Sequence, residues 1–442
     1  MPDHPSASPR RSTKRLAILV VTSTIASLLG TTFLGIGAAG ADTAPPAGLP
    51  ATVSADSLPT TQINGVAYDQ VIVGNTVYVT GEFSKARPAG SPVGQNESTR
   101  SNLLAYNLTT GTLLTTWAPS INAKGRSIVA SADGQTIYVG GNFTTANGVT
   151  RNRVAAFNAT TGALVTGFNP NSAYRVDDLA LSGNTMYIVG QFSAMGNQSR
   201  NRLAAVNATT GAVLPWAPGA DQEVATVVVA PGNRVIVGGH FTQLNGVDAK
   251  GMGSLDGTTG AVLPWSINQT LQDWGTDAGI TSLKTDGTSV FGTGYTFLVN
   301  GVQSGNFEGT FSADLNGNLQ WVTGCRGDHY DVDIEGPVVY DISHTHDCSS
   351  SGGNPQTNPW TFQHATAWTT APAANGATNV GGVFPGLPRP QILHWSPTCN
   401  PAPTPASRRL LGPSRATAST RCWAGSSRPS TTRPSTGLRD SR

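Results

Sequence analysis

Carboxylates and imidazoles that could hold a metal gather in residues 324–348, whose sequence is GCRGDHYDVDIEGPVVYDISHTHDC. On a β-strand alternate side chains share a face, so two sets of residues in this stretch align. The sets are Asp331, Asp333 and Glu335, and then His344 and His346. Oxygen ligands suit Ca²⁺, whereas paired imidazoles with a carboxylate suit Zn²⁺ or another transition metal. The sequence therefore predicts a candidate metal site and no other cofactor. The alternative is an acidic, solvated strand edge.

Cys325 and Cys348 bracket the same stretch at a separation of 23 residues. In an exported protein, two cysteines on either side of an irregular segment typically form a disulfide. Closing that loop restricts the unfolded chain and holds the segment in place. We therefore predict a Cys325–Cys348 disulfide; the alternative is a pair of free thiols.

The elements that would position these residues are repeated along the chain. A β-rich run that ends in small and aromatic residues occurs at 77–83 (VYVTGEF), 137–143 (IYVGGNF), 186–192 (MYIVGQF) and 235–241 (VIVGGHF). Weaker copies lie at 290–295 and 339–344, and the successive spacings are 60, 49, 49, 55 and 49 residues. A run such as VAAFNATTGALVTGF (154–168) follows, in which Asn opens a turn and Gly closes it. This pattern is typical of a β-hairpin.

A period near 49 residues with about four short strands predicts an all-β fold, a β-propeller with four-stranded antiparallel blades. Six units have recognisable ends, at Trp117, Phe168, Trp216, Trp265, Trp321 and Trp395. The prediction is six blades, or seven if the C-terminal region contributes. The propeller is expected to span residues 58–397.

One position after the glycine pair varies in type while its neighbours do not. Its six copies are Glu82, Asn142, Gln191, His240, Tyr295 and His344. Equivalent positions of a propeller form a ring, so these side chains are predicted to surround one mouth of the central channel and to bind a ligand there. The alternative is that they form hydrogen bonds to the next blade, as buried polar groups normally do.

The run from Ile137 to Gly162, with Asn147-Gly148 and Arg151-Asn152-Arg153 in place, resembles the delta-60 type propeller repeats of exported bacterial proteins. The resemblance is close over about residues 60–320 and looser over 321–397. It implies a secreted or surface-attached propeller and no agreed activity. The hairpin that ends in Trp is also similar to the repeat of quinoprotein-like propellers, but no adjacent cysteine pair or quinone pocket signature is present.

The N-terminus has the pattern of an export signal. A basic stretch (Arg10–Arg15) precedes an apolar run that ends in Ala39-Gly40-Ala41. Small residues at these positions suit signal peptidase, which predicts a signal peptide over 1–41 and a linker over 42–57. The alternative is an uncleaved membrane anchor. After cleavage no permanent membrane span is expected, and the protein is predicted to be secreted or held at the cell surface.

The C-terminal residues 398–442 are rich in Arg, Ser, Thr and Pro and show no strand periodicity. Two interpretations stay open, a disordered tail and an out-of-frame translation of a GC-rich gene. Residues 16–400 carry 15 basic and 23 acidic residues, a net charge of −8. That balance offers no basic footprint and argues against nucleic acid as a partner.

These observations predict a binding or interaction module whose ligand is unknown. Cell-wall or extracellular polysaccharide and protein are the partners considered. No catalytic motif stands out, so enzyme activity is not predicted. The alternatives are a propeller enzyme acting on polysaccharide with carboxylates from several blades, and a scaffold for envelope assembly.

Overall fold

The computed structural model describes residues 45–55, 59–299, 302–395 and 397, together with the backbone of residues 400–401 and 420–421. The predicted signal peptide and nearly all of the C-terminal tail lie outside the described residues. Within them, no helix is long and apolar enough to cross a membrane.

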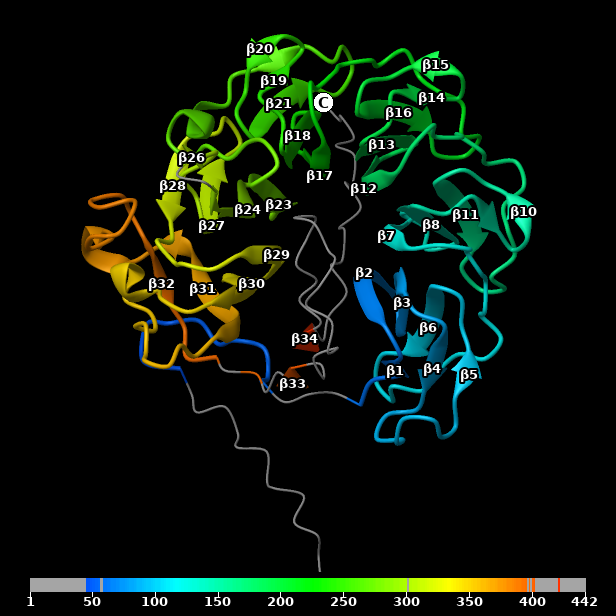
Figure 1. The fold of residues 1–442 in the computed structure, drawn as a ribbon, viewed down its shortest axis with the longest axis horizontal. Coiled ribbons are helices and arrows are strands. Elements are labelled where there is room, and N and C mark those ends of the chain that lie inside the picture. Colours follow the sequence, from blue (N-terminus) through cyan, green and yellow to red (C-terminus); the bar gives the residue numbers. More distant parts are fainter. Residues whose placement is uncertain are drawn as a thin grey trace, which may run out of the picture. The chain divides into compact units, whose positions relative to one another are not determined.

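The fold is all-β, and three short 3₁₀ turns are the only helical elements among the described residues. Six antiparallel sheets, here called sheets one to six, follow one another in chain order from β2 to β32 (Figure 1). Sheet one consists of β2 (Val66–Val73), β3 (Thr76–Glu82) and β6 (Leu103–Asn107). Sheet two consists of β7 (Gly125–Ala130), β8 (Thr136–Gly141) and β11 (Val154–Asn158). Sheet three consists of β12 (Val176–Ser182), β13 (Thr185–Gly190) and β16 (Leu203–Asn207). Sheet four consists of β17 (Val224–Ala230), β18 (Arg234–Gly239), β21 (Met252–Asp256) and β22 (Val262–Leu263). Sheet five consists of β23 (Ala278–Thr285), β24 (Ser289–Thr296), β27 (Gly309–Asp314) and β28 (Leu319–Val322). Sheet six consists of β29 (His329–Glu335), β30 (Val338–Thr345), β31 (Gln363–Pro372) and β32 (Pro390–Ile392).

Small sheets and turns complete the described structure. The small sheets are β1 (Gln62–Ile63) with β4 (Lys85–Arg87) and β5 (Ser98–Thr99), β9 (Thr145–Ala146) with β10 (Val149–Thr150), β14 (Ala194–Met195) with β15 (Gln198–Ser199), β19 (Gln243–Leu244) with β20 (Val247–Asp248), β25 (Leu298–Val299) with β26 (Val302–Gln303), and β33 (Asn400–Pro401) with β34 (Thr420–Arg421). The 3₁₀ turns are η1 (Ser266–Gln269), η2 (Ser349–Ser351) and η3 (Ala374–Gly376).

The expectation of four strands per sheet holds for sheets four, five and six. In sheets one to three the fourth strand is reduced to one bridged residue pair, as in Phe157 with Leu164. The hairpin turn is the predicted one. Asn158 accepts hydrogen bonds from the amides of Thr160 and Thr161, and Gly162 closes the turn at a φ of +69°. A positive φ is readily adopted by glycine, which explains why Gly recurs at this position.

An apolar cluster fills the space between each pair of consecutive sheets. The aromatic residue at the end of each hairpin lies in the cluster between its own sheet and the next: Trp117, Phe168, Trp216, Trp265 and Trp321. Tyr78, Tyr138 and Tyr187 pack edge-on against the first three of these rings. Each sheet thus buries its apolar residues by stacking on its neighbours, because a single sheet leaves both of its faces open.

The first strand of every sheet contains a register shift, and the residue after it is polar in all six sheets. These residues are Asp69, Ser127, Asp178, Thr226, Ser282 and Asp331. Asp178 accepts hydrogen bonds from Ser127 of sheet two and from Thr226 of sheet four at 2.9 and 3.1 Å. The series links every consecutive pair of sheets from one to six, and we call these residues the inner-strand links.

The predicted disulfide is confirmed, because Cys325 and Cys348 are bonded and both are buried. Next to it the main chains of Arg326 and Asp347 pair, and His346 donates its amide hydrogen to the Arg326 oxygen at 3.0 Å. The disulfide therefore holds the end of β30 against the segment that leads into β29.

Candidate functional site

The structure does not bring the predicted metal ligands together. Asp331 and Asp333 are exposed on β29, and Glu335 lies at the far end of that strand, opposite Val338. His344 and His346 lie at the other end of the sheet, beyond the pairing of His329 with Ser343. Among the described residues, no three His, Cys, Asp or Glu side chains gather as a metal ion requires. The metal site stays a prediction from sequence, and the structure adds no geometric support to it.

Two other members of the stretch, His329 and Asp341, are fully buried and serve the interface between sheets five and six. One carboxylate oxygen of Asp341 accepts hydrogen bonds from Thr310, Thr366 and the indole of Trp368 at 2.8–2.9 Å. Its other oxygen lies 3.4 Å from Nδ1 of His329. Burial would raise the pKa of Asp341, but His329 and the hydroxyl donors outweigh burial and hold the pKa below its usual value. Among the described residues this second oxygen and Nε2 of His329 have no hydrogen-bond partner, so the buried network is satisfied at one carboxylate oxygen only.

The six predicted ring residues lie at or near the ends of the middle strands, and the polar side-chain atoms of five of them contact protein groups. Three of them reach the next sheet. Glu82 pairs with Lys124 at 2.9 Å, Gln191 donates to Glu223 at 2.8 Å, and Nδ1 of His240 lies 2.8 Å from the Ala278 oxygen.

The other three ring residues contact residues of their own sheets. Asn142 accepts a hydrogen bond from Arg126 of its own sheet, Tyr295 packs on Phe297, and His344 contacts Tyr330. The contacts of Glu82, Gln191 and His240 fit the alternative interpretation, in which the ring position bonds to the next sheet, whereas these contacts of Asn142, Tyr295 and His344 stay within one sheet. A ligand ring at these residues stays a prediction.

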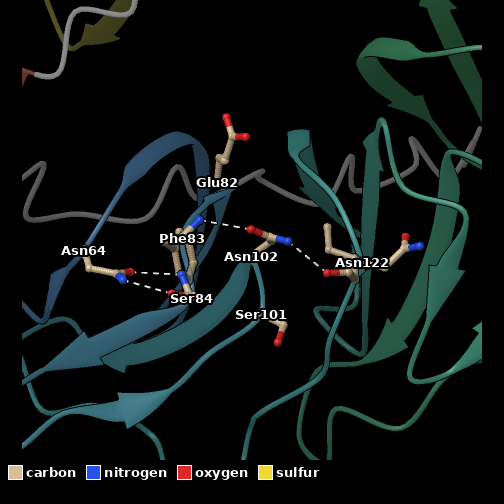
Figure 2. Close-up of a pocket in the computed structure, with 8 residues that line it drawn as sticks. Asn64, Glu82, Phe83, Ser84, Ser101, Asn102 and Asn122 are labelled. Carbon is tan, nitrogen blue, oxygen red and sulfur yellow. Dashed lines mark hydrogen bonds between the residues drawn. The ribbon is translucent and has the colours of Figure 1, made fainter. Parts of the chain in front are cut away.

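A pocket between sheets one and two includes Glu82. The asparagine side chains that line this pocket already form hydrogen bonds within the protein. Asn102 accepts a hydrogen bond from the Phe83 amide at 2.9 Å and donates one to the Ile121 main-chain oxygen at 2.9 Å. Asn64 accepts from the Ser84 amide and donates to its hydroxyl (Figure 2). Glu82 points away from both asparagines (Figure 2). The asparagines therefore fix the hairpin at the end of sheet one.

Aromatic rings and imidazoles gather at the end of sheet six. The ring of Trp360 stacks on that of His346 at 4.2 Å between centroids and 11° between planes. Phe362 contacts His344 at 5.9 Å and His364 at 6.5 Å. Trp360 is 55% exposed and Phe362 is 44% exposed. We call these five residues the aromatic–histidine surface.

Carboxylates and a phenol lie beside this surface. The hydroxyl of Tyr330 bonds to Nδ1 of His344 and lies 3.5 Å from an oxygen of Asp328. Glu308 accepts a hydrogen bond from the Gly327 amide at 3.2 Å. Burial, reinforced by the charge of Glu308, raises the pKa of Asp328 to about 6. Burial also raises the pKa of Glu308 above its usual value.

The cationic form of His344 is disfavoured. Burial, together with His329, His346 and His364 nearby, lowers the pKa of His344 to about 4. Near neutral pH His344 is therefore a neutral hydrogen-bonding group. The site combines exposed aromatic faces, neutral imidazole and carboxyl groups, which are the components of a binding site for a polar ligand with apolar faces.

His344 and His346 belong to the site predicted from the sequence, whereas Trp360, Phe362, Tyr330 and Glu308 were not predicted. One signal was available, because the segment NPWTFQH (358–364) puts two large aromatics in the irregular insertion of the last repeat. Outside the repeat pattern, neither aromatic has a place in the hairpin. Their stacking on His346 and His344 depends on how β31 returns to β30, which the sequence does not indicate.

Residues 132–168 match the model of a family described as a domain of unknown function, DUF5122, with a β-propeller fold. No curated protein sequence matches the chain. Among solved structures the chain is similar to the RRP9 WD40 repeats, with 9% identity, a TM-score of 0.44, and 71% of this chain and 81% of that chain covered. It is also similar to Kuenenia stuttgartiensis hydrazine synthase, with 11% identity, a TM-score of 0.44, and coverage of 70% and 78%. Residues 132–168 are thus similar to a β-propeller repeat of the DUF5122 type, which fits the delta-60-type resemblance predicted from the sequence.

Proposed function

We propose that this protein is an exported β-propeller interaction module that binds extracellular polysaccharide at the aromatic–histidine surface. The observation that supports the proposal is the side-by-side placement of exposed Trp360 and Phe362 with Asp328, Tyr330 and His344. Isolated exposed apolar residues are ordinary, but an exposed aromatic group next to hydrogen-bonding groups marks an interaction site.

A sugar ring fits the chemistry of this surface. One face of Trp360 is covered by His346, and its remaining exposure lets the C–H face of a sugar ring pack on the indole. Carboxyl and imidazole groups beside the aromatics can accept and donate hydrogen bonds to sugar hydroxyls. A neutral His344 serves this purpose without attracting anions.

The propeller proposed here consists of six blades over residues 58–397, one for each of sheets one to six. Inter-sheet clusters and inner-strand links between every consecutive pair support this assignment. Export through a cleaved signal peptide at 1–41 is part of the same proposal, and the Cys325–Cys348 disulfide supports an oxidising compartment.

Glu308 and Asp328 give a specific reason to consider a second function, hydrolysis of the bound polysaccharide. Both carboxyls have raised pKa values, and the charge of Glu308 acts on Asp328. A carboxyl with a raised pKa can act as a general acid in glycoside hydrolysis, with a second carboxylate as its partner.

The test is a binding screen of the secreted protein against soluble cell-wall oligosaccharides, followed by titration calorimetry. Trp360→Ala is expected to weaken binding about tenfold or more, because truncating an aromatic anchor costs more than about 1 kcal/mol. Tyr174→Ala is the matched control, since Tyr174 is 54% exposed but lies outside this surface. Equal binding by both variants would refute the site.

Release of new reducing ends decides between binding and hydrolysis. A binding module leaves the oligosaccharides intact. If wild type releases reducing ends and Glu308→Gln and Asp328→Asn do not, the second function is correct. If the secreted protein has the mass of the full chain that starts at Met1, cleavage of the signal peptide is refuted.

A further inference from the structure

Among the described residues, sheets one and six each pack on one neighbouring sheet, whereas the other four pack on two. Within the described residues, five apolar clusters each join two consecutive sheets, and none joins sheet six to sheet one. The second face of sheet one forms a cluster of its own around Val77, Val79 and Tyr106. The second face of sheet six does the same around Tyr340, Ala367 and Trp395.

The face of sheet six repeats the features with which the other sheets receive their neighbours. Tyr340 packs edge-on against Trp395 at 4.8 Å, as Tyr78 packs against Trp117 at 4.9 Å. In sheets one and three the indole of the exit tryptophan donates to a main-chain oxygen of the next sheet, as Trp117 does to Asn158. Nε1 of Trp395 is buried and has no hydrogen-bond partner. An indole N–H without an acceptor is expensive when buried, so this donor indicates a missing neighbour.

Trp265 shows that the orphan donor alone would be ambiguous, because its Nε1 also lacks a partner although sheet five follows. There Gly317 of sheet five lies directly on the indole ring. Among the described residues, no turn of a following sheet lies on the indole of Trp395. Trp395 is therefore the exit tryptophan that lacks both an acceptor for its indole N–H and a turn packed on its ring.

The N-terminal segment lies where the outer strand of a further sheet belongs. At sheet six, Leu49, Val53 and Ala55 pack on the cluster of Tyr340 and Trp395, and the Val53 amide donates to the Tyr340 hydroxyl at 2.7 Å. Tyr78, Tyr138 and Tyr187 use the same hydroxyl to reach the turn of their following sheet. Figure 1 shows this blue segment beside sheet six before it reaches β1.

At sheet one, Pro59 of the N-terminal segment takes the position that the last residues of a preceding sheet take elsewhere. The turn glycines Gly162 and Gly260 lie against Pro119 and Pro218, the prolines that end the preceding sheet. Gly111 of sheet one lies against Pro59 in the same way. Residues 49–55 therefore make the contacts of an outer strand at sheet six, and Pro59 makes those of its exit at sheet one.

The inner-strand links end at the same place. Ser127 stands between two aspartates: it donates to Asp178, and the next amide, Ile128, donates to Asp69 at 2.8 Å. Within the described residues the series stops at Asp331 of sheet six and Asp69 of sheet one. A strand placed between them would again stand between two aspartates, so it requires the chemistry of Ser127 and Ile128.

We infer that sheets six and one are the walls of a place for one more sheet, and that its occupant is a three-stranded antiparallel element of this same repeat with a hydroxyl residue at the inner-strand link. Residues 49–55 supply its outer strand. The inference rests on the proposed propeller arrangement and is independent of the polysaccharide site.

The experiment adds a second copy of residues 120–158, the strands of sheet two, to the C-terminus of the full chain. Residues 398–442 then separate the added copy from sheet six along the chain. We expect the melting temperature to rise by about 5 °C or more. Amide hydrogen exchange is expected to slow in β3, β6, β30 and β31, and to stay unchanged in sheet three.

The matched control carries Val139→Asp in the added copy only, which puts a charge on the face that would meet sheet six. Ser127→Ala in the copy is expected to keep part of the gain and lose the rest. If the control stabilises the chain as much as the intact copy, the inference is wrong.

Two further results would also overturn the inference. One is a dimeric full chain that the added copy does not make monomeric, because a second chain would then be the occupant. The other is a large fall in melting temperature when residues 398–442 are deleted from the full chain, because the tail would then be the occupant. Loss of oligosaccharide binding by Trp360→Ala is unaffected by either result, so the two proposals fail separately.

Discussion

Asp328 is the residue whose titration is most accessible to experiment. Its pKa of about 6 lies above the ordinary value because the carboxyl is buried and Glu308 is close; Tyr330, His329 and His344 also face it. Since the raised pKa favours the neutral form in the folded protein, Asp328 costs stability as pH rises from about 4 to 6.

We predict that oligosaccharide binding strengthens between pH 5 and pH 7, because Asp328 then becomes a carboxylate acceptor. Calorimetric titrations at several pH values measure this, and Asp328→Asn should flatten the profile. A profile unchanged in Asp328→Asn would assign the pH dependence to another group.

Asp341 is the residue on which the interface of sheets five and six depends. Asp341→Ala leaves the hydroxyls of Thr310 and Thr366 without this acceptor, whereas the indole of Trp368 keeps the Thr366 hydroxyl oxygen as a partner. Each orphaned buried donor costs about 1–3 kcal/mol, so the free energy of unfolding should fall by about 2 kcal/mol or more. Urea unfolding measures it, with exposed Asp248→Ala as a control that should change by less than about 0.5 kcal/mol.

The disulfide belongs to the scale of the element, because it fixes the geometry between β29 and β30. It holds Arg326 against Asp347, and this pairing positions His346 under Trp360. We predict that replacing Cys325 and Cys348 by serine lowers the free energy of unfolding by about 2–5 kcal/mol. Oligosaccharide binding should fall as well.

Urea titration of the double variant measures the first effect and calorimetry below the unfolding transition measures the second. Loss of stability with full binding would show that the aromatic–histidine surface forms without the disulfide. Dithiothreitol added to the wild-type protein is the matched treatment and should reproduce the double variant.

The inner-strand links act at the scale of the whole molecule, because each one joins two sheets. Asp178 accepts hydrogen bonds from the hydroxyls of Ser127 and Thr226 and from the Val227 amide. Asp178→Ala therefore removes the inner-strand links of sheet three to both of its neighbours. We predict a loss of about 2–4 kcal/mol and faster hydrogen exchange in sheets two and four as well as sheet three. Exchange confined to sheet three would show that the links are local.

Local chemistry explains how much of the fold could be predicted. The turn of Asn158 and Gly162 is specified within five residues by an amide acceptor and a positive φ, and the alternating strands on either side follow from it. The disulfide followed from two cysteines around an irregular stretch. Four full strands were predicted for every sheet, but Leu113, Leu164 and Val213 pair only as single bridges because the chain soon leaves towards the next sheet.

The sequence by itself determined the repeat, the all-β fold, the hairpin turns and the disulfide, because each depends on residues close in the chain or on a repeated spacing. Tertiary structure alone decided which polar residues meet. Asp341 lies in the stretch predicted to hold a metal and accepts a hydrogen bond from Thr310 of sheet five, and the predicted metal ligand His346 stacks on Trp360. Those contacts depend on a register shift in β29 and on the return of β31, and neither leaves a local signal in the sequence.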